Sequence, residues 1–185
     1  MKQIKLIVLV ILMILLYGCN KAAVNQVSFE IYLVSGEFPS AEDIDIDKLT
    51  LEKTPVLTLN DIRKYYWDEQ AFVTKQDFLT EQIMAQTNQS VPVGGLPYVV
   101  VVNGERIYIG KFWTAISSVS PYSPSILVNW ATGADFEKYD LQPDQHLYAI
   151  YWNNDDPGAK EIVFDERIYK ALEQSNLLSG NNTAD

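Results

Sequence analysis

The chain is poor in the residue types that most often carry catalysis or cross-link a fold: it has one cysteine, Cys19, and one histidine, His146, among 185 residues. One cysteine cannot form an internal disulfide or a multi-cysteine metal site. A serine–histidine–aspartate mechanism would have to use His146 as its base, and no G-x-S-x-G motif accompanies it. We therefore expect no catalytic residues of this type.

Basic residues are also few. Lys and Arg number 14 against 24 Asp and Glu, which gives a formal net charge of −10. Two of the 14, Lys2 and Lys5, lie in the first 18 residues, so the rest of the chain carries 12 basic residues against 24 acidic ones. Nucleic acids are polyanions that proteins bind through basic patches. The composition therefore argues against a nucleic-acid partner.

The N-terminal segment, MKQIKLIVLVILMILLYGCN, joins a positive start to an apolar run from Leu6 to Leu16. This layout is typical of a secretory signal peptide, and the run is shorter than the roughly 20 residues that span a bilayer. It ends in Leu16-Tyr17-Gly18-Cys19, which resembles the lipobox of bacterial lipoproteins, with a larger residue than usual at Tyr17. The resemblance implies cleavage before Cys19 and lipidation of its thiol by a diacylglyceryl group, with palmitate-type acyl chains.

These features predict the organisation of the chain. We expect a lipoprotein signal peptide at 1–18, a lipidated tether at 19–26, a single domain at 27–178 and a disordered tail at 179–185. Two acyl chains anchor a protein stably, whereas one is marginal. The expected location is the outer, extracytoplasmic face of the bacterial cytoplasmic membrane; an uncleaved membrane anchor is the alternative.

The sequence pattern of the domain predicts an α+β fold. Asn103-Gly104 between two apolar runs predicts a hairpin with a type I′ turn, and Tyr98–Val102 is apolar on both faces, as in a central strand. Helical spacing of apolar residues predicts two main helices, at 75–89 and 165–177. Further strands are expected at 27–34, 65–73, 126–130 and 147–152. The sheet should be mixed or antiparallel, with a ferredoxin-like arrangement as one form.

Residues 27–110 resemble the first extracytoplasmic head domain of SecD in the order FEIYLV, VLTLNDI, DFLTEQI and GLPYVVVVNGERIYIG. That resemblance implies a ferredoxin-like sheet. Leu59 stands where that family tends to have Gly, and no transmembrane helices follow, so its transport role is not carried over. The chain is also similar to an uncharacterised group of Gram-positive lipoproteins sharing PYVVVVNGERIYIG followed by FW and SS, which implies a fold and a location but no activity.

Two acidic segments invite a metal-site interpretation. The run EDIDIDK at 42–48 places carboxylates at alternate positions, as calcium loops do, but Lys48 and Thr54 stand where an EF-hand needs Gly and Glu. A solvated acidic loop is the favoured interpretation, and cation binding by 42–47 stays open. The run NNDDPG at 153–158 is expected to be a turn. We expect no metal and no cofactor.

Paired carboxylates offer an enzymatic alternative. A glycosidase needs two acids about 5 to 9 Å apart across a cleft, whereas Asp68 and Glu69 are neighbours that would point to opposite faces of a strand. The sequence therefore nominates no catalytic pair. A cell-envelope hydrolase using Asp/Glu acid–base chemistry remains the alternative function.

Aromatic residues next to loops provide the leading hypothesis. Exposed Trp and Tyr supply large, rigid contact areas for proteins or sugars, and core filling is the alternative role. The candidate interaction surface comprises Phe112, Trp113, Tyr122 and Trp130. We expect a non-enzymatic binding or interaction module that contacts an envelope protein or cell-wall glycan through loops around 112–124.

Overall fold

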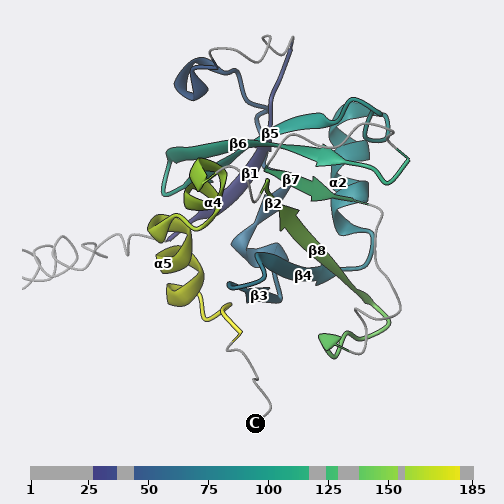
Figure 1. Cartoon of the computed structure of the whole chain (residues 1–185). Coiled ribbons are helices and arrows are strands. Elements are labelled where there is room, and N and C mark those ends of the chain that lie inside the picture. The colour runs from purple at the N-terminus through teal and green to yellow at the C-terminus, as the bar shows by residue number, and fades with distance from the viewer. Residues whose placement is uncertain (1–26, 37–43, 117–123, 129–137, 154–156, 180–185) are drawn as a thin grey trace, which may run out of the picture.

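The computed structural model describes residues 27–36, 44–116, 124–128, 138–153 and 157–179. Within these residues eight strands form one mixed sheet, which confirms the α+β class (Figure 1). The strands are β1 (Phe29–Leu33), β2 (Leu57–Thr58), β3 (Lys64–Tyr66), β4 (Ala71–Lys75), β5 (Leu96–Val102), β6 (Glu105–Trp113), β7 (Ser125–Leu127) and β8 (Gln145–Tyr151). The helices are α2 (Phe78–Thr87), α4 (Pro157–Val163) and α5 (Glu166–Gln174), with 3-10 turns η1 (Ile46–Lys48) and η2 (Leu59–Asp61).

The sheet has the order β2-β1-β5-β6-β7-β8-β4-β3. Neighbouring strands are antiparallel except β6 and β7, which are parallel. A flat sheet of eight strands would hold its edge strands about 33 Å apart. The edge strands β2 and β3 are joined only by residues 59–63, which reach at most about 20 Å. The sheet must therefore be rolled, and Figure 1 shows β5 and β6 above β4 and β3.

The C-terminal segment covers the outer edge of β3. The Tyr65 amide donates to the Leu177 carbonyl at 2.8 Å, and the Ser179 amide donates to the Tyr65 carbonyl at 2.9 Å. A parallel bridge joins Tyr65 to Leu178. The expected disordered tail therefore does not begin at Ser179, because that residue pairs with β3; residues 180–185 lie outside the described residues.

One large core fills the inside of the rolled sheet. Its largest fully buried side chains are aromatic and come from β3, β4, β5, β6 and β8: Tyr65, Phe72, Tyr98, Phe112 and Tyr148. Buried residues of α2, α4 and α5 complete it, among them Ile83, Val163 and Leu172. All three helices therefore pack against the same core as the strands.

A second, smaller core lies on the other face of β1 and β5 and explains the alternation in EDIDIDK. Leu49, with the half-buried Ile44 and Ile46, packs against Val99 and Val101. The Arg106 guanidinium on β6 donates to the carbonyl oxygens of Ile46 and Leu49. The expectation of a solvated loop is confirmed for the exposed Asp45, Asp47 and Lys48, whereas the isoleucines between them cover the sheet.

Most expected elements are present near their predicted positions. The Asn103-Gly104 hairpin is confirmed, with φ of 51° and 83° at the two turn residues, and β5 is central and buried on both faces. The helices expected at 75–89 and 165–177 are confirmed as α2 and α5.

Other expectations are wrong. The strand expected over 65–73 is two strands, β3 and β4, because residues 67–70 form a turn in which Gln70 adopts a φ of 48°. Pro157-Gly158 opens α4 instead of ending a turn, as proline does at a first helical position. A ferredoxin-like sheet is not confirmed.

Candidate functional site

Phe112 and Trp113 lie in the core instead of on a surface. Their exposed fractions are 0% and 6%. Phe112 packs on Tyr98 with ring centroids 4.7 Å apart, and a Cβ placed on Gly95 would lie 2.5 Å from Trp113 Cε3. Both residues belong to β6, which has a neighbouring strand on each side. The expectation that these two side chains offer an interaction surface is therefore wrong.

The other residues of that candidate surface lie outside the described residues. Tyr122 and Trp130 fall in the segments 117–123 and 129–137, and Cys19 falls in 1–26. Their assigned roles stay predictions. Ile116, which is described, is 81% exposed, so the chain does expose an apolar side chain three residues after the end of β6.

The structure places the His146 ring and the Asp144 carboxylate against different residues. The His146 ring on β8 lies 4.4 Å from the Tyr148 ring, measured between centroids. The Asp144 carboxylate accepts a hydrogen bond from Arg63 Nη2 at 3.2 Å. Asp144 therefore forms an ion pair that links the loop before β8 to the segment before β3.

Among the acidic candidates, the structure describes Asp45, Asp47, Asp68 and Glu69. Asp45 accepts from the Asp47 amide at 3.1 Å and pairs with Lys48 at 2.8 Å, so it caps η1. Asp68 and Glu69 both belong to the turn between β3 and β4. Over the described part of the chain, no group of three or more His, Cys, Asp or Glu side chains could hold a metal ion. Glu42, Asp43, Asp155 and Asp156 lie outside it.

No helix in the described ranges of the chain is long and apolar enough to cross a membrane.

A groove lies where the two edges of the rolled sheet approach each other; we call it the seam groove. Its volume is about 930 Å³. One wall comes from the start of β1 and from β2 with η2, and the other comes from the end of α5. The lining residues are Val27, Ser28, Phe29, Glu30, Thr58, Leu59, Asn60, Ile62, Gln174, Ser175 and Leu177.

Short-range hydrogen bonds shape the first wall. Thr58 and Asp61 form a capping box around η2, in which Asp61 Oδ2 accepts from the Thr58 amide at 2.8 Å and from its hydroxyl at 2.7 Å. The Ser28 amide donates to Asn103 Oδ1 at 2.9 Å, and the Asn103 amide donates to Ser28 Oγ at 3.1 Å. The hairpin turn thus holds the start of β1.

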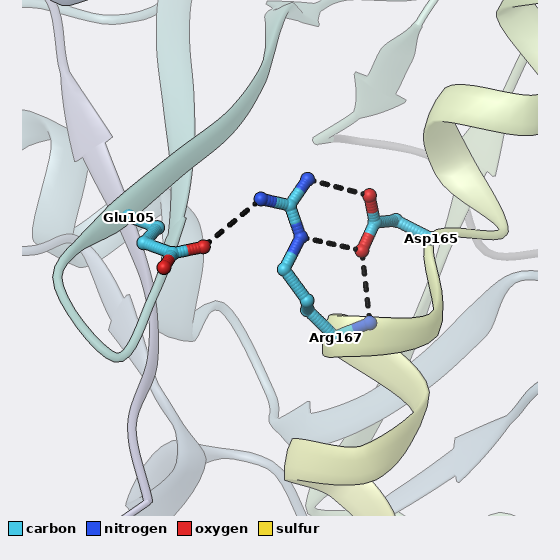
Figure 2. A network of polar contacts seen from close by, with 3 residues as sticks. All are labelled: Glu105, Asp165 and Arg167. Carbon is cyan, nitrogen blue, oxygen red and sulfur yellow. Dashed lines mark hydrogen bonds and ion pairs between the residues drawn. The ribbon is translucent and has the colours of Figure 1, made fainter.

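An ion-pair network positions α5, which forms the second wall. Figure 2 shows the Arg167 guanidinium between Glu105, at the β5–β6 turn, and Asp165, at the start of the helix. Its nitrogens lie 3.0 Å from Glu105 Oε2 and 2.7 Å from Asp165 Oδ2. Asp165 also caps α5 by accepting from the Arg167 amide at 2.8 Å. The Arg167 guanidinium holds the pKa of the Asp165 carboxyl below its ordinary value of 3.8.

The lining of the seam groove carries negative charge at one residue and is otherwise uncharged. Glu30 is the one ionisable residue among those that line it. Burial, together with the neighbouring Glu30 carboxylate, raises the pKa of the Tyr32 phenol. The C-terminal end of α5 adds a weaker negative potential, because the carbonyl oxygens of Ala171, Leu172 and Glu173 already accept hydrogen bonds from residues 175–177. Hydroxyl, amide and aliphatic groups make up the rest of the lining.

Sequence reasoning missed this groove because its residues come from separate segments, 27–30, 58–62 and 174–177. Each segment is unremarkable by itself. Only the rolling of the sheet, which follows from strand order, brings them together.

Comparisons with family models, with curated proteins and with solved structures found no match to this chain.

Proposed function

We propose that this chain is a membrane-tethered, extracytoplasmic binding module of the bacterial cell envelope, lipidated at Cys19, and that the seam groove is its binding site. The single observation that carries the binding role is the groove of about 930 Å³ at the seam of the sheet. Ligand sites in proteins are concave and typically occupy about 300 to 1,000 Å³. The groove falls in this range.

The lining supports binding more than catalysis. General acid–base chemistry needs ionisable groups placed at the reacting atoms, whereas the groove offers one carboxylate, Glu30. Two of its hydroxyl groups already donate to neighbours: Thr58 Oγ1 to Asp61 at 2.7 Å, and Ser175 Oγ to the Ala171 carbonyl at 2.9 Å. A wall of neutral polar groups held by such hydrogen bonds suits recognition.

The position of the groove also suits a tethered protein. Its lining begins at Val27, directly after the segment expected to serve as the tether. Residues 19–26 reach at most about 28 Å when fully extended. A lipid on Cys19 would therefore keep the groove close to the membrane surface, where a ligand in the cell envelope is accessible.

Intact-mass and N-terminal peptide analysis of the full-length protein, made in a Gram-positive host, tests the tether. We expect a mature chain that begins at a diacylglyceryl-modified Cys19 and fractionates with membranes, and we expect Cys19→Ala to lose both properties. A membrane-bound wild-type chain of full precursor mass, with no acyl groups on Cys19, would instead favour the uncleaved anchor.

A further inference from the structure

Both walls of the seam groove favour a positively charged ligand. On one wall, Glu30 supplies the only ionisable side chain of the lining, and its carboxylate keeps its charge while accepting a hydrogen bond from the Tyr32 phenol. On the other, α5 ends at the groove through Gln174 and Ser175, and a helix C-terminus attracts cations. Lys, Arg and His are not among the lining residues. The charge of the groove therefore complements an ammonium or guanidinium group.

The polar groups that face solvent in the groove match a peptide main chain. Asn60 on η2 and Gln174 on α5 are exposed and stand on opposite walls. A primary amide offers donors and an acceptor, so each can pair with the N–H and C=O groups of an extended peptide. Ser28 Oγ, by contrast, already accepts from the Asn103 amide at 3.1 Å.

Apolar side chains between these polar groups complete the match. Val27, Leu59 and Leu177 are half-buried in the lining. The aliphatic stem of a Lys or Arg side chain packs on such surfaces while its charged end reaches a carboxylate. Mixed apolar and neutral polar lining with one carboxylate therefore suits a basic side chain better than an acidic one.

We propose that the seam groove binds an extended peptide segment of an envelope component through a Lys or Arg side chain, with Glu30 facing the charge and Asn60 and Gln174 holding the main chain. The inference rests on the proposed binding role of the groove and is independent of the lipid tether. It assigns the ligand to basic peptides and excludes acidic ones.

Titration of three blocked pentapeptides into the full-length protein in detergent micelles tests this assignment. The probes are acetylated and amidated Ala-Ala-X-Ala-Ala, where X is Lys, its uncharged counterpart norleucine, or Glu. We expect the Lys peptide to bind about tenfold more tightly than the norleucine peptide, and the Glu peptide to bind most weakly. The preference should shrink as salt is added, because screening weakens exposed charge pairs.

Variants locate the effect. Glu30→Gln should reduce the Lys preference about fivefold and leave the norleucine peptide unchanged. Gln174→Ala, on an exposed helix position that tolerates substitution, should weaken the Lys and norleucine peptides equally. The matched control is Glu81→Gln, which removes the same charge from an exposed position on α2 outside the groove lining, and it should change nothing.

Several results would overturn the assignment: equal affinity for all three peptides, no binding of any up to about 1 mM, equal effects of Glu30→Gln and Glu81→Gln, or a preference for spermidine over the Lys peptide. The tether is tested separately. An unlipidated Cys19 would remove the proposed anchor and leave the peptide result standing, whereas equal peptide affinities with correct lipidation would remove only the ligand class.

Discussion

Trp113 lies against a glycine whose backbone conformation and surroundings both disfavour a side chain. Gly95 has a φ of +81°, and a Cβ there would lie 2.5 Å from Trp113 Cε3 and 3.2 Å from the Phe112 carbonyl oxygen. Left-handed backbone is costly for residues with a Cβ. The contact explains how an aromatic residue at the end of β6 becomes buried next to a loop.

We expect Gly95→Ala to lower the free energy of unfolding by about 2 to 4 kcal/mol, since it combines backbone strain with overpacking. The neighbouring Gly94→Ala is the control, because a Cβ there would meet nothing within 4 Å, and it should change stability by less than about 0.5 kcal/mol. Urea unfolding of both variants measures the difference. Similar midpoints would contradict the packing of Trp113 on Gly95.

Phe112, near the end of β6, and Ile116, shortly after that strand, differ sharply in exposure. Phe112 is fully buried and Ile116 is 81% exposed. We expect Phe112→Ala to destabilise the fold by about 3 to 5 kcal/mol through a cavity, and Ile116→Ala to change stability by less than about 0.5 kcal/mol. Thermal unfolding of the two variants checks this. A stable Phe112→Ala protein would mean that the side chain is not part of the core.

At the scale of elements, α5 depends on a cap that is also an ion pair. Asp165 caps the helix and pairs with Arg167, and its pKa is lowered, first by the hydrogen bond from that guanidinium. Because the folded-state pKa is lowered, the ionised carboxylate stabilises the fold at pH values above 3.8, its ordinary pKa. This contribution is lost as the pH falls through the lower, folded-state pKa.

Asp165→Asn keeps a good capping residue and removes the charge. We expect a loss of about 0.5 to 1 kcal/mol at neutral pH, and we expect the difference from the wild-type protein to vanish as the pH falls below the folded-state pKa of Asp165. Urea midpoints measured from pH 7 downward test both parts. A difference that persists unchanged in acid would show that the carboxylate charge is not what stabilises α5.

Local signals explain which elements were predictable. The Asn103-Gly104 turn fixes its hairpin through two adjacent residues, and the apolar run Tyr98–Val102 marks a central strand without further context. The break between β3 and β4 had no such local signal. Gln70 adopts a φ of 48° there, and its buried side chain is held by a hydrogen bond in which the Tyr65 hydroxyl donates to Gln70 Oε1 at 2.8 Å. That contact is tertiary, so the sequence pattern did not indicate it.

The candidate site was less predictable than the elements for the same reason. The burial of Phe112 depends on β7, a short strand that joins β6 in parallel, and parallel pairing leaves no turn motif in the sequence. The walls of the seam groove belong to β1, η2 and α5, whose residues meet only after the sheet rolls. Strand order, which no local pattern specifies, decides both features.

At the scale of the whole molecule, buried phenols make the rolled fold sensitive to alkali. Burial raises the pKa values of Tyr65, Tyr98 and Tyr108 above their ordinary value of 10.0, and it raises that of Tyr148 to about 12. A raised folded-state pKa gives a stabilisation that is complete below pH 10 and is lost progressively as the pH rises from 10 to the folded-state pKa, because only the unfolded chain ionises in that interval.

We therefore expect cooperative unfolding between about pH 10 and 12, with each buried phenol costing about 1.4 kcal/mol per pH unit above 10. In a titration followed by circular dichroism and phenolate absorbance together, the part of the absorbance change that belongs to the buried phenols should coincide with the loss of structure. Tyr148→Phe should move the midpoint upward. Ionisation of all 11 tyrosines before any loss of structure would contradict the burial of these rings in one core.

The tether and the groove together make up the central claim, that a lipid on Cys19 presents the seam groove to a component of the cell envelope. The groove begins at the residue where the expected tether ends, so a reporter in the groove should depend on the anchor. Asn60 is suited to carry it, because it is exposed on the groove wall, and Glu81 is an exposed position on α2 outside the lining.

The most direct measurement is photo-crosslinking in cells from a photoreactive residue at position 60 of the full-length protein, followed by mass spectrometry of the adducts. We predict an adduct with one envelope component that is absent from position 81 and is lost in the Cys19→Ala background. The same adduct from both positions, or an adduct from position 60 that is unaffected by Cys19→Ala, would contradict the claim.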